Sequence, residues 1–213
     1  MKAIYTAIIG NYEELKEPTV ITPGFDYICF TDQPLKSKVW QIRKIEVEPG
    51  LTPQRMARKI KILPHIFLPS YTFTFWLDAS FQINCDLTKF VNYFKPPLTC
   101  PAHPLRHCWL QEANSCIANK RGNAEDISRQ RDDYKALEVP QARGIITSGL
   151  LMRDNSTECI NMCNDWWAEV EKYSTRDQLA FARIGREHNH HLFRWDYSQS
   201  KELKYIRHFH LRH

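Results

Sequence analysis

An apolar run that ends in a single carboxylate is the part of this sequence best suited to chemistry. Residues 73–77 are Phe-Thr-Phe-Trp-Leu, Asp78 follows, and the small residues Ala79 and Ser80 come next. Such a run predicts a strand buried on both faces, with Asp78 at its carboxyl end, where open α/β sheets bind ligands. A carboxylate there could hold a divalent cation or a ribose. The alternative, that Asp78 only caps the following turn, fits the stretch equally well.

A second carboxylate, Asp177, is followed directly by an amide, Gln178. The same segment matches a capping box, in which Gln178 would reach back to the backbone of Thr175 at a helix start. From the residues alone, the capping box is the favoured interpretation.

Several potential metal ligands gather in one short segment: Cys100, His103, His107, Cys108 and Cys116. Their spacing matches no common zinc finger, and Pro101 and Pro104 stiffen the loop. A zinc-binding interaction module is therefore a minor hypothesis. Cys159 and Cys163 lie four residues apart on one predicted helix face and are expected in the core.

These residues require a scaffold of alternating strands and helices. Strands are expected at 2–9, 26–32, 39–47, 73–77, 144–152 (interrupted by Ser148-Gly149) and 203–213. Helices are expected from Pro53 to about Leu63, at 86–94, at 109–138 with a break near Gly122, at 155–173 and from Thr175 onward. The pattern predicts an α/β fold with a mixed, mostly parallel central sheet flanked by helices.

The first helix carries four basic residues away from its apolar face. Met56, Ile60 and Leu63 recur at helical spacing and are expected to face the core. The basic residues are Arg55, Arg58, Lys59 and Lys61. The simplest interpretation is a solvated basic face.

Composition restricts the class of protein. A length of 213 residues with 43% hydrophobic content suits one globular domain, and no apolar run is long enough for a membrane span. The net charge of +5 favours anionic partners, but no basic segment interleaved with aromatics predicts nucleic-acid binding. Seven cysteines without scaffold spacing suggest a reducing, cytoplasmic compartment.

Several motifs together resemble glycosyltransferases of the GT-A fold. They are residues 7–12 (Ala-Ile-Ile-Gly-Asn-Tyr), 55–59, 76–80 (Trp-Leu-Asp-Ala-Ser), 147–151 (Thr-Ser-Gly-Leu-Leu), Trp166-Trp167, 176–178 (Arg-Asp-Gln) and 208–210 (His-Phe-His). The pattern is most similar to the glycogenin-like retaining enzymes and to the plant and bacterial TOD1/MUCI70-type transferases. The chain also resembles the N-terminal transferase domain of large algal-virus proteins, which implies a host-cytoplasmic location and further domains in a longer polypeptide.

The resemblance implies a nucleotide site in the N-terminal part, about residues 1–85, and an acceptor and catalytic part at about 86–213. It implies donor contacts from Thr6, Ala7, Asn11, Tyr12, Arg58, Lys59, Asp78, Thr147 and Ser148, with Tyr12 stacked on uracil. It places His103 and Arg106 near the active site. Of the pair Trp166-Trp167, one tryptophan is expected in the core and the other near the acceptor. The family places an Asp-Gln pair at this point beside the donor sugar. The resemblance thus implies that Asp177 contacts sugar hydroxyls and that Gln178 lies below the anomeric carbon, which reverses the preference for a capping box.

The family's D-x-D metal motif is altered here, because Ser80 stands at the second acidic position. The resemblance implies Mn²⁺ (or Mg²⁺) held by Asp78, by Ser80 directly or through water, and by a late histidine, His208 or His210. A hydroxyl is a weaker ligand for a hard cation than a carboxylate, so reduced metal affinity is expected.

The expected function is metal-dependent transfer of a hexose or deoxyhexose from a UDP-sugar, UDP-glucose or UDP-L-rhamnose, to a glycan acceptor with retention of configuration. The alternative is a nucleotide-sugar hydrolase, or a carbohydrate-binding module without transfer activity. Such a module would keep the aromatic residues but would not need the Asp177-Gln178 pair.

Overall fold

A seven-stranded sheet forms the centre of the computed structural model, which describes residues 1–141, 145–195 and 200–205. The strand order is β3-β2-β1-β4-β7-β6-β8. In chain order these strands are β1 (Lys2–Ile8), β2 (Asp26–Thr31), β3 (Gln41–Lys44), β4 (Phe73–Leu77), β6 (Leu98–Pro101), β7 (Leu150–Asp154) and β8 (His191–Phe193). A separate two-stranded sheet pairs β5 (Phe81–Ile83) with β9 (Leu203–Tyr205).

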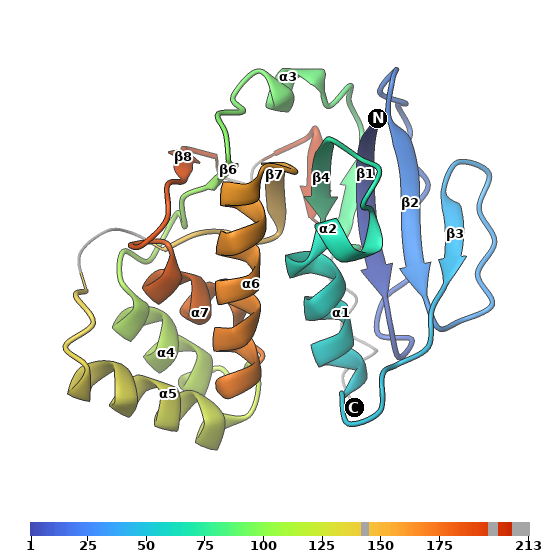
Figure 1. Ribbon diagram of the computed structural model, residues 1–213. Helices are drawn as coiled ribbons and strands as arrows, with labels where there is room; N and C mark the ends of the chain where they lie inside the picture. The colour runs from blue at the N-terminus through green and yellow to red at the C-terminus, as the bar shows by residue number, and fades with distance from the viewer. Residues whose placement is uncertain (142–144, 196–199, 206–213) are drawn as a thin grey trace.

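The direction of the strands brings distant segments together at one edge of the sheet. β1 pairs in parallel with both β2 and β4, so the carboxyl ends of these strands share an edge, as their arrowheads show in Figure 1. β7 runs antiparallel to β4 and to β6. The residues just before Leu150 therefore lie at the same edge as Asp78, which follows β4.

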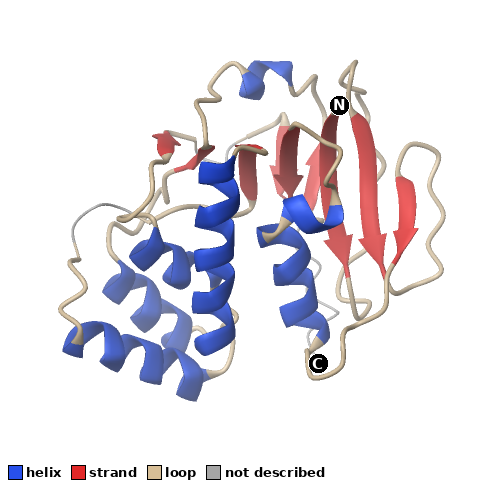
Figure 2. Cartoon of the chain, viewed as in Figure 1, coloured by secondary structure: helices blue, strands red, loops and turns tan. Residues whose placement is uncertain are grey.

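Two helices cover one face of the sheet, α1 (Pro53–Ile62) and α6 (Thr157–Lys172), drawn in front of the strands in Figure 2. As expected, Thr52 caps α1 by accepting a hydrogen bond from the Arg55 N–H, and Pro53 fills the first helical position. Met56, Ile60 and Leu63 are buried against the strands, which confirms the predicted core face.

The opposite face is covered by shorter elements. Leu87 lies just before α3 (Thr88–Val91) and Phe90 lies within it, and both pack with the β5–β9 sheet against residues of β1 and β4.

A separate hydrophobic cluster joins three further helices, α4 (Trp109–Ala118), α5 (Ala124–Ala136) and α7 (Asp177–Ile184). One further short helix, α2 (Pro64–Phe67), follows α1.

The predicted fold class is confirmed, with local differences. Of the expected strand at 144–152, the described part forms a strand only from Leu150, because Ser148 and Gly149, the predicted interruption, form a turn that passes beside Asp78. The expected strand 39–47 is limited to Gln41–Lys44. The helical pattern of 109–138 divides into α4 and α5 on either side of Gly122, as predicted. None of the helices in the described ranges has the length and apolar character needed to span a membrane.

Candidate active site

Two carboxylates meet on one buried ammonium at the shared strand edge. Lys61 Nζ lies 2.7 Å from Asp177 Oδ2 and 3.1 Å from Asp78 Oδ1. It also donates to Ser148 Oγ at 3.2 Å. Lys61 comes from the last turn of α1, Asp78 follows β4, Asp177 begins α7 and Ser148 precedes β7. Four segments far apart in the chain thus converge on one charge cluster.

The backbone around Asp78 fixes where its carboxylate points. Its N–H donates to the Gly149 carbonyl at 2.9 Å, and the Trp76 indole N–H donates to Oδ1 at 2.7 Å. A Cβ on Gly149 would lie 3.4 Å from Asp78 Oδ2 and 3.0 Å from the Phe81 ring. The tight contact is with the Phe81 ring, so glycine at 149 allows that ring to pack closely against the turn, in keeping with the close approach that a Gly inside the predicted strand suggested.

Lys61 was wrongly expected on a solvated face, since its side chain is 1% exposed. Arg153 on β7 fixes the end of α1 by donating hydrogen bonds to the carbonyls of Lys61 and Ile62 at 2.7 and 3.2 Å. The Tyr5 hydroxyl donates to the same Lys61 carbonyl at 2.9 Å. These bonds hold the backbone so that the ammonium enters the site.

The Asp177 carboxylate stays ionised despite complete burial. Burial raises the pKa of Asp177, but the charges of Lys61 and Arg58 outweigh it and hold that pKa well below its ordinary range. Arg58 Nε lies 3.8 Å from Asp177 Oδ2 and donates to the Thr175 carbonyl. The structure thus brings the predicted residues Asp78, Asp177, Ser148 and Arg58 together around Lys61.

Gln178 does not form the capping box that its spacing suggests. Its amide N–H donates to the Ile146 carbonyl at 2.6 Å, and its Oε1 accepts from Arg176 Nη2 at 3.1 Å. The Thr175 hydroxyl instead donates to Gln54. Gln178 is half-buried beside Asp177, and both the N–H₂ group and the oxygen of its side-chain amide are hydrogen-bonded.

A second ionic network lies directly behind Gln178. Glu112, on α4 and 0% exposed, accepts from Arg176 Nη2 at 3.1 Å and pairs with Arg106 Nε. Arg106 also contacts the His103 ring, whose pKa is lowered to about 4 by burial and then by the Arg106 charge. His103 and Arg106 are therefore connected to Gln178 through Glu112, a residue that the sequence did not single out.

The loop after β1 carries the other predicted donor contacts. Ala7 is buried, and its carbonyl accepts from the Tyr12 hydroxyl at 3.1 Å, while Asn11 is exposed and adopts a φ of 55°. Thr6 is 2% exposed, and its Oγ1 has no hydrogen-bond partner among the described residues. Thr6 and Asp78 both line a small cavity together with Lys16.

The side chains of two predicted donor contacts bond to groups outside the Lys61 cluster. Lys59 points away from Lys61, pairing with Glu48 Oε2 at 2.5 Å and lying over the Trp167 ring at 5.9 Å. The reason is that residues 58 and 61 share one side of α1 whereas 59 lies about 100° around it. Thr147 is buried and bonds to the backbone, through its N–H to Pro101 and its hydroxyl to Ala102.

The predicted division of the tryptophan pair is wrong. Trp166 and Trp167 both belong to the core cluster under α1, at 0% and 7% exposure. Trp166 nevertheless supports the site, because its indole N–H donates to the Asp177 carbonyl at 2.9 Å.

The metal prediction is only partly addressed by the described residues. Ser80 is half-buried in the turn after Asp78, but His208 and His210 lie outside the described ranges. Within those ranges, no group of three or more His, Cys, Asp or Glu residues could hold a metal ion, including the segment considered for zinc. Cys159 and Cys163 are buried core residues, as expected.

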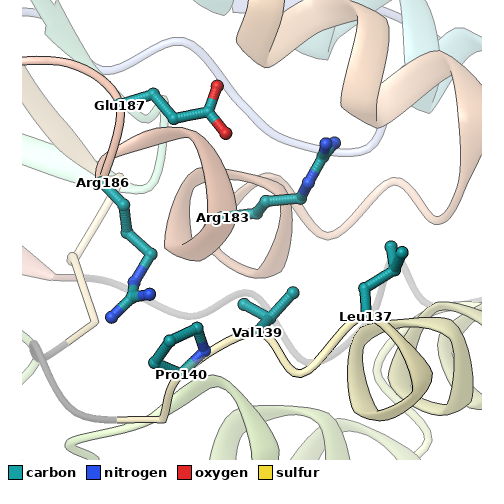
Figure 3. A pocket seen from close by; sticks show the side chains of 6 residues that line it. All are labelled: Leu137, Val139, Pro140, Arg183, Arg186 and Glu187. Carbon is teal, nitrogen blue, oxygen red and sulfur yellow. The ribbon is translucent and has the colours of Figure 1, made fainter.

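A larger cavity of about 400 Å³ lies away from this cluster, at the far end of α7 (Figure 3). It is lined by Leu137, Val139, Pro140, Arg183, Arg186 and Glu187. None of these is a predicted site residue, and Arg183 is already paired with Glu169 at 2.6 Å.

A mixed sheet with carboxylates gathered at the ends of its parallel strands is the architecture of an α/β domain that binds its ligand at that edge. Comparison with known proteins narrows this class. Residues 29–206 match the model of the TOD1/MUCI70, glycosyltransferase-like domain, and the chain belongs to that family.

One protein is similar in sequence and one solved structure is similar in fold. The chain is 20% identical over 216 residues to the probable hexosyltransferase MUCI70 of Arabidopsis thaliana, covering 85% of this chain and 36% of that protein. Its fold is similar to the apo structure of the WbbM bifunctional glycosyltransferase, with a TM-score of 0.55 and 8% identity over 89% of this chain and 38% of that one. The chain thus spans little more than a third of either relative.

Proposed function

We propose that this domain transfers a hexose or deoxyhexose from a UDP-linked donor to a glycan acceptor at the edge where Lys61 joins Asp78 and Asp177. The observation that carries the proposal is this buried cluster beside Gln178, in a chain of a glycosyltransferase-like family. The name of the plant relative supports a hexose. UDP-glucose and UDP-L-rhamnose are the proposed donors.

The charge around the cluster suits an anionic donor. Four cationic side chains accompany three carboxylates in the two linked networks: Lys61, Arg58, Arg106 and Arg176 with Asp78, Asp177 and Glu112. The excess of positive charge favours a diphosphate. The exposed Tyr12 ring offers a flat surface to a base.

In the proposed transfer, some residues of the cluster bind the sugar and others stabilise the charges that develop as the donor bond breaks. Asp177 remains a carboxylate at neutral pH and can accept hydrogen bonds from sugar hydroxyls. When the bond between the anomeric carbon and the diphosphate oxygen breaks, UDP leaves with the electron pair. Arg58 and Lys61, the cations beside Asp177, would stabilise that negative charge. The Gln178 amide oxygen would face the positive charge on the sugar, and retention rests on the resemblance to glycogenin-like enzymes.

We also propose a divalent cation, Mn²⁺ or Mg²⁺, at Asp78. Oδ1 of Asp78 is engaged by Lys61 and Trp76, so Oδ2 is the oxygen that fits a metal ligand. Ser80 and a late histidine, His208 or His210, would complete the shell. Such an ion would neutralise the diphosphate as a Lewis acid.

A thermal-shift panel tests the donor. UDP, UDP-glucose and UDP-L-rhamnose would be compared with GDP and CDP, each with Mn²⁺ or with EDTA. At a hundredfold excess over Kd, a bound nucleotide stabilises by about 2.7 kcal/mol, which raises Tm by roughly 5–10 °C for a domain of this size. We expect the UDP compounds to give this shift and to lose most of it in EDTA.

Three outcomes would contradict parts of the proposal. Stabilisation by GDP or CDP but not by UDP would show that the loop after β1 does not read uracil. An undiminished shift in EDTA would remove the cation, and no shift with any nucleotide would remove the donor site altogether.

A further inference from the structure

The Gln178 amide is held at both ends, and this fixes which way it faces. Its N–H₂ group donates to the Ile146 carbonyl at 2.6 Å, and its oxygen accepts from Arg176 Nη2 at 3.1 Å. Reversing the amide would set its N–H₂ against the guanidinium and its oxygen against a carbonyl. Arg176 therefore determines that oxygen and nitrogen keep their places.

The same guanidinium is held by a carboxylate with no exposure to solvent. Arg176 Nη2 also lies 3.1 Å from Glu112 Oε1. The arginine stem packs beside Gly122, where a Cβ would make an ordinary contact with Arg176 Cδ at 3.5 Å. Although burial raises the pKa of Glu112, Arg176 and Arg106 together hold it below its ordinary value, so the carboxylate is charged.

We infer that Glu112 is a positioning residue for transfer: through Arg176 it fixes the Gln178 amide, and it neutralises the guanidinium that does so. An uncompensated Arg176 beside Gln178 would oppose the positive charge that develops on the sugar as the donor bond breaks. With Glu112 paired to it, Arg176 orients the amide oxygen while part of its charge is offset by a carboxylate that it shares with Arg106. This inference rests on the proposed function.

Glu112→Gln is the primary variant, because it keeps the shape of the side chain and removes its charge. Glu169→Gln is a matched control: Glu169 is also buried and bound by an arginine, Arg183, and by the Tyr134 hydroxyl, each at 2.6 Å. If Glu112→Gln fails to fold, Arg176→Met breaks the same link while Glu112 keeps Arg106.

Steady-state kinetics should separate positioning from a general structural role. We expect Glu112→Gln to lower kcat for donor turnover at least tenfold without raising the donor KM, because the added positive charge attracts the diphosphate. Glu169→Gln should keep kcat within twofold of wild type. In a Gln178→Ala background, adding Glu112→Gln should cost less kcat than it does in wild type, because the group it positions is gone and only the effect of the Arg176 charge remains.

Two kinetic results would overturn the inference. One is the same fold-loss from Glu112→Gln in both backgrounds, and the other is a kcat for Glu112→Gln within twofold of wild type.

An NMR measurement tests whether Glu112 holds the Gln178 amide, and it does not depend on donor turnover. Absence of turnover by the wild-type protein would refute the proposed function and would leave this measurement valid. The ¹⁵N side-chain signals of Gln178, identified by their loss in Gln178→Ala, should move toward free-amide values in Glu112→Gln and stay in place in Glu169→Gln. Unmoved signals in Glu112→Gln would show that Glu112 does not hold the amide.

Discussion

Lys61 is the cation that pairs with both carboxylates of the site, Asp78 and Asp177. Its ammonium is almost fully buried, and an ion so placed is tolerated only when paired charges and hydrogen bonds replace water. Asp78, Asp177 and Ser148 provide them. The ammonium thus holds the side chains of Asp78 and Asp177 close together at the strand edge.

The depressed pKa of Asp177 predicts a specific acid sensitivity. Because its pKa lies below the unfolded value of about 3.9, Asp177 adds stability that is fully present above about pH 4 and is lost as pH falls further. In urea unfolding between pH 5 and 3, the stability of wild type should fall faster than that of Asp177→Asn, by up to about 1.4 kcal/mol per pH unit. Parallel curves would contradict this account, and the largely exposed Asp165→Asn is the control that should follow wild type.

At the residue scale, sequence patterns found the site only in part. Asp78 was predictable because it ends a buried strand, and Asp177 because of the family motif. Lys61 was missed because helical periodicity says which residues share a face but not what that face meets. Glu112 was missed because an acid in the first turn of a helix is expected for reasons of the helix dipole alone.

At the scale of elements, the turn after β1 is pressed against the start of α1. Gly10 adopts a φ of 79°, and its N–H donates to both carboxylate oxygens of Asp32. A Cβ at this position would lie 2.7 Å from Pro53 Cβ. The turn that presents Asn11 and Tyr12 therefore depends on a glycine for two separate reasons.

Gly10→Ala should be more destabilising than a matched glycine substitution. Gly50 has a similar φ of 84° but nothing within 4 Å of its added Cβ, so Gly50→Ala isolates the conformational cost. That cost is about 1–2 kcal/mol, and we expect Gly10→Ala to exceed it by roughly 1–3 kcal/mol because of overpacking against Pro53. Equal losses of unfolding free energy in the two variants would show that the contact with Pro53 relaxes freely.

The elements themselves followed from sequence where their signals were local. Thr52-Pro53 marked the start of α1, and Gly122 marked the break between α4 and α5. The limits of β7 did not follow, because the residues before Leu150 are as apolar as a strand, yet tertiary contacts make them a turn beside Asp78. Such contacts depend on strand order, which periodicity does not contain.

At the scale of the whole molecule, the directions of the strands in the seven-stranded sheet explain why distant motifs converge. Among its described strands, β7 runs antiparallel to both of its neighbours, β4 and β6. Parallel β1, β2 and β4 end at one edge, and antiparallel β7 begins there. Helices α1 and α7 then add Lys61 and Asp177 to that edge. The central claim is that the bond between the sugar and the diphosphate of a nucleotide sugar is broken at this edge of the sheet.

Release of UDP from UDP-glucose and UDP-L-rhamnose, measured with Mn²⁺ for wild type and Asp177→Asn, tests that claim most directly. Both proteins would be assayed below their unfolding temperatures, with the largely exposed Asp165→Asn as a control for the chemical change. We expect wild type and the control to release UDP from at least one donor, and Asp177→Asn to be slower by on the order of 100-fold because the sugar is no longer held in place. Equal rates in Asp177→Asn and wild type, or no UDP release by wild type from either donor, would contradict the claim.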